Sequence, residues 1–288
     1  MTDANSALEF TGERFTPECV REIWYEHFHR YAFALSLVGG KTVLDAACGE
    51  GYGSSLLATA AGSVLGLDIS AQAVTHATNR YAGQRANLAF QQADVAALEA
   101  MPSGTFDVIC SFETLEHLHA QESMLAGFRR LLAPGGILLV STPDKHNYSD
   151  LTGFNNEHHV RELYRDEFEA MLLREFRHVR LYAHKLAFQS MVWSLDGTSG
   201  QFIAQTVGDH AEVRQGLDYP PLYYIAVCSN DPLPDLPALS LFGDAGESVY
   251  AHYYHEIRKN MSAGARIQQL EAELDQALAR LSELENLR

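Results

Sequence analysis

Short apolar runs alternate with helical patterns between residues 42 and 141. Five of these runs are rich in aliphatic and β-branched residues and have the length of strands, and helical stretches separate them. The expected strands cover residues 43–45, 63–68, 88–90, 106–112 and 137–141. Strands that are apolar almost throughout, with helices between them, predict a parallel sheet that is covered by helices on both faces.

The intervening stretches predict helices, the last of which runs through Leu132 and is ended by Pro134 and the two glycines after it. After a polar loop rich in histidine and asparagine, the pattern predicts a helix at 165–176 and strands at 178–182 and 223–228. We expect an α/β fold, a Rossmann-like doubly wound sheet of about seven strands with the last strand antiparallel and a C-terminal helix or coiled coil.

The segments outside this pattern divide the chain into expected parts. An insertion at about 183–221 is long for a connection inside one domain, which indicates a functional role. Three prolines within seven residues predict a stiff linker at 231–246. The linker would separate a domain at 41–230 from a C-terminal helix at 247–288, and residues 1–40 precede the domain.

Apolar residues recur at heptad spacing in the C-terminal segment. The two series are Ile267, Leu274 and Leu281, and Leu270, Ala277 and Leu284. Arg280 and Glu285 then occupy a g position and the following e position, where they can pair between parallel helices. The pattern predicts a coiled coil that joins copies of the chain through residues 262–288, and the alternative is an amphipathic helix packed on its own domain.

The charge balance narrows the function classes. The 37 acidic and 21 basic residues give a formal net charge of −16, and such a surface repels nucleic-acid backbones and anionic lipids. The four cysteines include no CxxC pair, so neither a zinc site nor a disulfide framework is expected. No apolar stretch approaches the roughly 18 residues of a membrane span, and the N-terminus has no signal-peptide pattern. The expected location is the cytoplasm.

The most specific motif is a glycine-rich turn after the first strand. Asp45 ends the strand, and Gly49, Gly51 and Gly53 follow at the spacing GxGxG before a helix. Glycines there let the backbone turn tightly and approach a ligand, while the helix N-terminus offers N–H groups. Nicotinamide-dependent dehydrogenases use a similar turn, but their usual spacing is GxGxxG.

Acidic residues also follow the second and third strands, at Asp68 and at Asp94. With Asp45, they place a carboxylate at three successive strand ends. This pattern resembles the class I S-adenosylmethionine (SAM)-dependent methyltransferases, over about residues 41–143. The resemblance implies that Asp45 lies near the methionine part of SAM, that Asp68 binds both ribose hydroxyls, and that Asp94 binds the adenine amino group. The cofactor-binding residues expected are Arg14, Asp45, Ala47, Gly49, Gly51, Asp68, Ile69, Asp94, Val95 and Glu113.

A second candidate site follows the fourth strand, at the sheet edge where open α/β sheets bind ligands. His117 is a candidate general base for an acceptor hydroxyl, because an imidazole titrates near neutral pH. The alternative is that it only bonds backbone. Glu113, Glu116 and His117 also match the ExxEH pattern of ubiquinone-type O-methyltransferases, in which these residues can hold a divalent metal. At this spacing they need not converge, so no metal ligands are assigned and a metal is not favoured.

Two further segments complete the expected site. The polar loop after the fifth strand supplies a second candidate base from the pair His158 and His159, with His158 preferred. The other hydrogen-bonding side chains of this loop suit a polyhydroxylated acceptor, although a solvated loop without function would look the same. The N-terminal segment resembles the lid of bacterial methyltransferases found with polysaccharide and glycosyl-transfer functions. Residues 1–40 are therefore expected to form a helical lid, from which Arg14, His29 or Arg30 could meet the carboxylate of SAM.

These features predict a cytoplasmic SAM-dependent O-methyltransferase that acts on a hydroxyl of a sugar or glycan, in the biosynthesis of a cell-surface polysaccharide or glycoconjugate. One rival is a small-molecule methyltransferase for a phenol, quinone precursor or amine, with an acceptor cavity built from Phe154, Phe188, Met191 and Trp193. Another is a non-catalytic scaffold that keeps the methyltransferase fold and works through its coiled coil. The intact set of cofactor residues argues against the scaffold.

Overall fold

The computed structural model describes residues 22–197, 202–208 and 211–286. It separates into two compact units, one that ends at Phe242 and one that begins at Gly243. Each unit is described by itself below.

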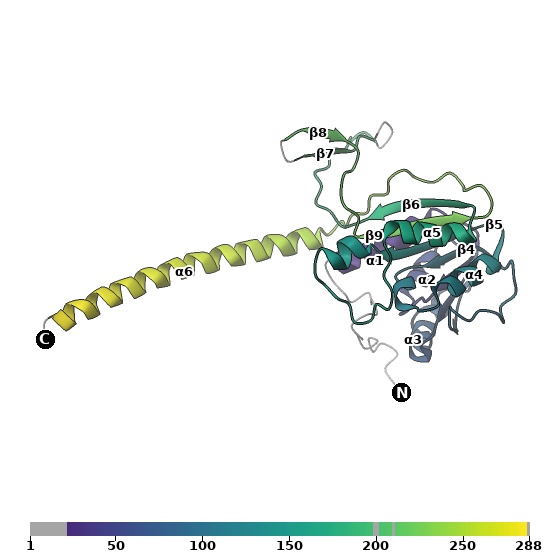
Figure 1. The fold of residues 1–288 in the computed structure, drawn as a ribbon, viewed down its shortest axis with the longest axis horizontal. Coiled ribbons are helices and arrows are strands. Elements are labelled where there is room, and N and C mark those ends of the chain that lie inside the picture. The colour runs from purple at the N-terminus through teal and green to yellow at the C-terminus, as the bar shows by residue number, and fades with distance from the viewer. Residues whose placement is uncertain (1–21, 198–201, 209–210, 287–288) are drawn as a thin grey trace. The chain divides into compact units, whose positions relative to one another are not determined.

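The first unit is built on a seven-stranded sheet (Figure 1). Its strands are β1 (Thr42–Ala46), β2 (Ser63–Asp68), β3 (Leu88–Gln92), β4 (Phe106–Ser111), β5 (Leu132–Pro143), β6 (His178–His184) and β9 (Tyr223–Ser229). They are ordered β3-β2-β1-β4-β5-β9-β6. Strands β1 to β5 pair in parallel, and β9 runs antiparallel to both β5 and β6. The expected sheet of about seven strands with an antiparallel last strand is confirmed.

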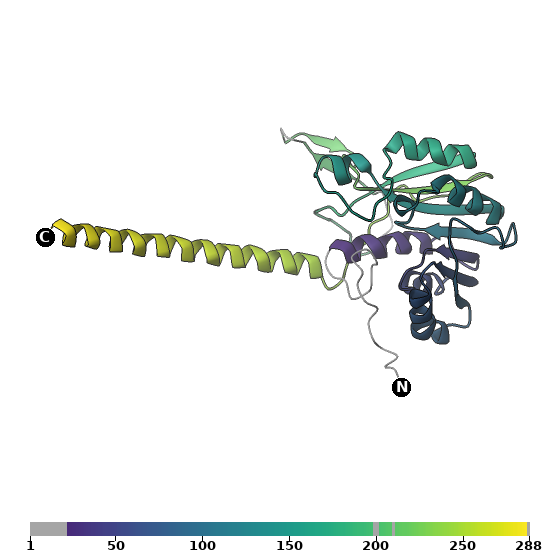
Figure 2. The ribbon, with the colours of Figure 1, turned by 60° about the horizontal axis from the view of Figure 1, so that its bottom comes forward.

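Helices cover both faces of this sheet, as Figures 1 and 2 show. They are α1 (Glu22–Leu35), α2 (Tyr52–Leu57), α3 (Ala71–Tyr81), α4 (Gln121–Leu131) and α5 (Arg165–Glu175). One apolar cluster joins the sheet to Phe128 of α4 and Phe168 of α5, and the other joins it to Phe33 of α1 and Leu57 of α2. Val43 and Leu44 of β1 belong to different clusters, which is why two successive positions of this strand are apolar.

The ends of several elements follow local chemistry. The hydroxyl of Ser70 accepts a hydrogen bond from the Ala73 N–H and caps α3, which begins at the next residue, Ala71. Helix α4 ends at Leu131, before Pro134 and the following glycines, and these residues lie inside the long strand β5. The helix therefore ends one residue earlier than expected, and the extended chain begins before Pro134 and not after the glycines. The backbone N–H of Leu132 closes the last turn of the helix and the chain then becomes extended.

The insertion after β6 differs from the expected irregular segment. It contains a small antiparallel pair, β7 (Gln205–Val207) and β8 (Val213–Gln215). Strands of three residues are too short to carry a readable alternation of apolar and polar positions, so the sequence pattern does not reveal them.

Helix α1 is part of the domain core. Phe33 and Ala34 are buried, and the hydroxyl of Tyr31 donates a hydrogen bond to Asp45 on β1 at 3.0 Å. This described part of the expected lid is thus fixed to the sheet, because moving it away would expose these side chains. Residues 1–21 of the expected lid lie outside the described residues.

The proline-rich segment also packs on the first unit, at least as far as Phe242. Leu236 is buried in the cluster shared by α1 and α2, and the carbonyl oxygen of Pro237 accepts a hydrogen bond from Tyr182 at 2.9 Å. The ring of Phe242 stacks on His29. The first unit therefore extends about a dozen residues past the expected boundary at residue 230, because the leucines between the prolines supply apolar surface that a free linker would leave in water.

The second unit consists of one long helix, α6 (Ser248–Asn286). Its heptad leucines are exposed, with Leu270 46% and Leu284 64% accessible. Among the described residues, no helix combines the length and the apolar character needed to cross a membrane.

We predict that a chain of residues 1–242 unfolds at the temperature of the first unit in the full chain, whereas a chain that ends at residue 230 is less stable. The loss of Leu236 from the core alone should lower the free energy of unfolding by about 1.5–3 kcal/mol. Thermal unfolding followed by circular dichroism measures this difference. Equal midpoints for the two truncated chains would show that the segment after residue 230 is a linker after all.

Candidate active site

The carboxyl ends of the parallel strands open into a cavity of about 1090 Å³. It is lined by the loops after β1, β2, β3 and β4, by α1 and by the loop after β5. Of the expected site residues, the cavity is lined by Ala47, Gly49, Asp68, Ile69, Asp94, Val95, Glu113, His117 and His158. Asp45 and Gly51 do not line it, and Arg14 lies outside the described residues.

Asp68 fixes the shape of the glycine-rich turn. One of its carboxylate oxygens accepts a hydrogen bond from the Gly49 N–H at 2.9 Å, and the other accepts one from the Ser70 N–H at 2.8 Å. Ala47, just before the turn, adopts a φ of +62°, a left-handed conformation that is strained for alanine. The same side chain therefore ties the ends of β1 and β2 together and faces the cavity.

Asp45 and Gly51 stabilise this turn by packing and hydrogen bonds away from the cavity. Asp45 is fully buried and accepts hydrogen bonds from Tyr31 at 3.0 Å and from Ser54 at 2.6 Å. Burial raises the pKa of Asp45 to about 6, against the lowering effect of the two hydroxyls. A Cβ on Gly51 would lie 2.6 Å from the Cβ of Ala77, so glycine is needed there for the packing of α2 against α3.

Glu50 is a lining residue that the sequence analysis did not single out. Its buried carboxylate accepts hydrogen bonds from Arg80 at 2.9 Å and from Tyr81 at 2.8 Å, and lies 2.8 Å from a ring nitrogen of His76. These three partners belong to α3, about 30 residues further along the chain. No local spacing in the sequence indicates this contact.

Arg30 is buried beneath the cavity, with 1% of its surface exposed. Its Nη2 lies 3.3 Å from a carboxylate oxygen of Glu113, and its guanidinium lies over the ring of Tyr223. None of its three side-chain nitrogens makes a hydrogen bond with another described residue. Glu113 itself has a φ of +51° and accepts a second contact, a 2.5 Å hydrogen bond from the hydroxyl of Ser141.

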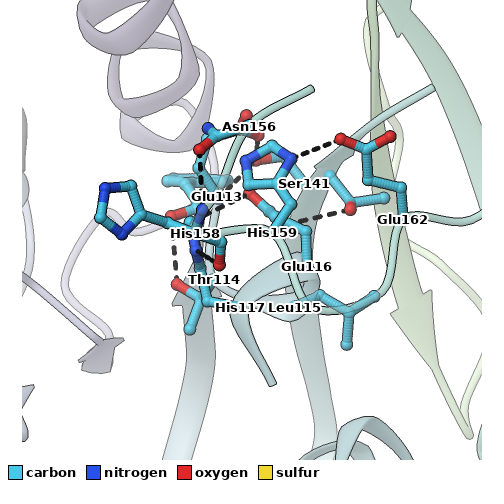
Figure 3. Close-up of polar contacts among 12 residues, drawn as sticks. Glu113, Thr114, Leu115, Glu116, His117, Ser141, Asn156, His158, His159 and Glu162 are labelled. Carbon is cyan, nitrogen blue, oxygen red and sulfur yellow. Dashed lines mark hydrogen bonds and ion pairs between the residues drawn. The ribbon is translucent and has the colours of Figure 1, made fainter. Parts of the chain in front are cut away.

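Two histidines and a glutamate meet where the loops after β4 and β5 line the cavity, and we call this part of the cavity its acceptor end (Figure 3). Glu116 and His117 lie on η2 (Leu115–His117), directly after β4, and His159 lies on the loop after β5. The ring Nδ1 of His117 is 3.0 Å from the carbonyl oxygen of His158, and the ring Nδ1 of His159 is 2.5 Å from a carboxylate oxygen of Glu162. His158 therefore contributes its backbone to the cluster, while its own ring is exposed and 3.7 Å from Glu157.

Glu116 is 1% exposed, and the hydroxyl of Thr142 donates a hydrogen bond to its Oε2. Burial raises the pKa of Glu116 well above its usual value, and the nearby charge of Glu113 raises it further. Glu116, His117 and His159 were all named from the sequence, His159 as one of the pair that could supply a base, but nothing in the sequence brought His159 to Glu116 or gave a role to Glu162. The separation of 42 residues between the two histidines of this cluster carries no recognisable spacing signal.

The lining is strongly acidic. Among the described residues that line the cavity there are six carboxylates and one arginine, with no lysine. The carboxylates belong to Glu50, Asp68, Asp94, Glu113, Glu116 and Glu157. Such a lining favours a ligand that carries positive charge, and the buried guanidinium of Arg30 offers donors to a carboxylate.

Comparison with known proteins shows the family of this chain. The family described as "Methyltransferase domain" matches residues 37–193, more than half of the chain. The chain belongs to this methyltransferase family. A probable SAM-dependent methyltransferase from Mycolicibacterium smegmatis is 35% identical over 170 residues, which are 58% of this chain and 64% of the relative. A probable SAM-dependent methyltransferase from Mycobacterium tuberculosis is 33% identical over 175 residues, 60% of this chain and 62% of the relative.

This methyltransferase thus spans less than two thirds of the length of these two relatives. The crystal structure of the YcgJ protein of Bacillus subtilis shares the fold, with a TM-score of 0.51 and 17% identity over 72% of this chain and 100% of that one. Family membership implies SAM as the cofactor. The residues present fit it, because SAM carries a sulfonium, an ammonium and a carboxylate, which match an acidic cavity with one buried arginine.

Proposed function

We propose that this methyltransferase transfers the methyl group of SAM to a hydroxyl oxygen of a sugar or glycan unit, in the biosynthesis of a cell-surface polysaccharide or glycoconjugate. The observation that carries the proposal is the polar lining of the acceptor end. Tyr148, Asn155, Asn156, Glu157, His158 and His159 line it. Their hydroxyl, amide, carboxylate and imidazole groups can exchange hydrogen bonds with several hydroxyls of one acceptor.

The cavity is slightly larger than the usual pocket for one small molecule, which agrees with a site that holds SAM and part of an acceptor. Pockets of about 300–1,000 Å³ usually hold one small molecule, and this cavity has about 1090 Å³. The lack of lysine in the described lining and the pairing of Arg30 with Glu113 argue against a phosphorylated acceptor group.

On the cofactor side, we propose that Asp68 binds the ribose hydroxyls and that Asp94, Ile69 and Val95 surround the adenine. Asp94 is exposed at the rim of the cavity, and one of its oxygens accepts a hydrogen bond from the Ala96 N–H, which leaves the other oxygen for a ligand. Arg30 is the described residue best suited to the carboxylate of SAM, because its nitrogens are buried without hydrogen bonds among the described residues.

When bound, SAM supplies a methyl group on a sulfonium, so the departing thioether is neutral. The chain's own task is to position the acceptor oxygen and to ease the loss of its proton as the O–CH₃ bond forms and the S–CH₃ bond breaks. We propose that His117 assists this proton loss, because its ring lines the cavity and is held through Nδ1. His158 remains a second candidate, with an exposed ring that also lines the cavity.

The rival function with an apolar acceptor finds less support. Of the four side chains expected to build an aromatic acceptor cavity, only Phe154 lines it. Phe188, Met191 and Trp193 are 61–70% exposed and lie elsewhere on the insertion.

A cytoplasmic location remains part of the proposal. The three described cysteines, Cys48, Cys110 and Cys228, are free and buried. Free thiols are the usual state in a reducing compartment.

We predict that Asp68→Asn weakens SAM binding about 10- to 100-fold, because one charged hydrogen-bond acceptor for the ribose is worth about 1.5–3 kcal/mol. Isothermal titration calorimetry measures the effect. Asp107→Asn is the matched control, since Asp107 also accepts a backbone N–H, from Thr42 at the start of β1, but does not line the cavity. Equal affinity of Asp68→Asn and the unmodified chain would remove Asp68 from the ribose site, and no binding of SAM by the unmodified chain would favour a non-catalytic scaffold.

A panel of acceptors tests the substrate class. S-adenosylhomocysteine release should be seen with unphosphorylated glycosides or glycan fragments, and His117→Ala should lower kcat by about 10²- to 10⁴-fold with little change in the Kd of SAM. The kcat of His158→Ala should be measured beside it. This change removes the second candidate base and keeps the carbonyl oxygen that holds His117, so the two kcat values show which ring assists proton loss. Transfer to phenols or amines alone would overturn the sugar assignment.

We also propose that the chain assembles into an oligomer through α6. The exposed heptad positions support this, as does Asn260, which lies seven residues before Ile267 at the same heptad position. A single asparagine there is a known determinant of register in parallel two-stranded coiled coils.

The molar mass measured by light scattering should be at least twice that of one chain, and residues 1–242 should be monomeric. Leu274→Glu should dissociate the oligomer, whereas Gln276→Glu, two positions away and outside the apolar series, should not. A monomeric full chain would contradict the coiled coil.

A further inference from the structure

We propose that Glu116, His117 and His159 form a binding site for a divalent transition-metal cation at the acceptor end of the cavity. Membership in the methyltransferase family does not require a metal, so the family match does not imply this site. Its use in catalysis rests on the proposed function, but its existence does not.

The three side chains converge although they come from two loops. One ligand atom from each lies within 4.8 Å of the others (Figure 3). Two imidazoles and one carboxylate are a common donor set for zinc and for other first-row metals. Magnesium and calcium prefer oxygen donors throughout, so this set favours manganese, cobalt, nickel or zinc over both.

Each imidazole is oriented from behind by an acceptor. His117 Nδ1 is 3.0 Å from the carbonyl oxygen of His158, and His159 Nδ1 is 2.5 Å from Glu162. Glu162 is itself held by a 2.5 Å hydrogen bond from the hydroxyl of Ser149. Metal-binding histidines almost always use their second nitrogen in this way, and a backbone carbonyl and a carboxylate are the two usual partners. Nε2 is therefore the nitrogen that each ring presents to a cation.

The carboxylate of Glu116 supplies an independent observation. Its Oε2 is paired with Thr142, but within the described residues its buried Oε1 has no hydrogen-bond partner. The contact of Oε1 with His117 Nε2 measures 3.8 Å, too long for a hydrogen bond. A buried carboxylate oxygen without a partner is costly, and a cation between Glu116 and the two histidines would satisfy it.

This donor set differs from the ExxEH set considered from the sequence. Glu113 is excluded, because one of its oxygens accepts the hydroxyl of Ser141 and the other pairs with Arg30. His159 takes its place.

Three protein ligands leave coordination positions for water or an acceptor oxygen, as in catalytic metal sites. A hydroxyl bound there would lose its proton more readily, because the cation stabilises the alkoxide. With a cation bound, His117 would act as its ligand and not as the base, and the proton would pass to His158 or to water. The acceptor class that such a site fits is one with a hydroxyl next to a second oxygen, as in a vicinal diol of a sugar.

The test is calorimetric titration of the untagged full chain with Co²⁺ and with Zn²⁺, without SAM or acceptor. We expect one equivalent to bind, and Glu116→Gln and His159→Ala each to weaken binding at least 10-fold. Glu162→Gln should weaken it about 10-fold by releasing the ring of His159. His158→Ala is the matched control, since it removes an adjacent exposed imidazole that is not in the set, and it should bind as the unmodified chain does.

Circular dichroism and SAM titration confirm that each variant is folded. Absence of stoichiometric binding to the unmodified chain would overturn the site. So would unchanged binding by both Glu116→Gln and His159→Ala, or an equal loss in His158→Ala. Because metal and SAM are titrated separately, failure of the metal site leaves the proposed methyl transfer intact, and failure to bind SAM would overturn the latter alone.

Discussion

The parallel pairing of β1 with both β2 and β4 is the constraint on which the site depends. In this register Asp45 lies opposite Gly66 on one side and Cys110 on the other. The carboxyl ends of the three strands therefore reach the same edge of the sheet, and their loops have to meet there. Asp68 then joins two of these loops by accepting the N–H of Gly49.

That edge concentrates buried charge, which is expensive unless each group finds a partner. Most of the groups do: Asp45 is held by two hydroxyls, and Glu50 by three side chains of α3. Among the described residues, Arg30 and one oxygen of Glu116 are the charged groups that remain buried without a hydrogen bond at this cavity. A folded protein tolerates such groups where a ligand completes them, which is the physical basis for the proposals that place the carboxylate of SAM at Arg30 and a cation at Glu116.

Much of the domain could be predicted from residue patterns, because each strand and helix is a local matter of apolar periodicity, capping and turn chemistry. Helix α3 begins at the residue after Ser70 because that serine caps it, and a capping serine before a helical pattern can be recognised in the sequence. The end of the domain was harder to predict. A run of prolines indicates a linker, yet Leu236 within it is buried, because it joins an apolar cluster whose other members come from distant helices and strands.

The sequence by itself determined how the main strands and helices follow one another along the chain. It also determined the glycine-rich turn, the acids that follow the strands and the heptads of α6. All of these depend on neighbours a few residues apart. Only the tertiary structure decided which of the acids face the cavity. Asp45 and Asp68 look alike in the sequence, but Asp45 is turned toward Tyr31 and Ser54, and Asp68 faces the cavity. The tertiary structure also brought Arg30 to Glu113 and His159 to Glu116, because these contacts depend on how α1 and the loop after β5 pack against the sheet edge.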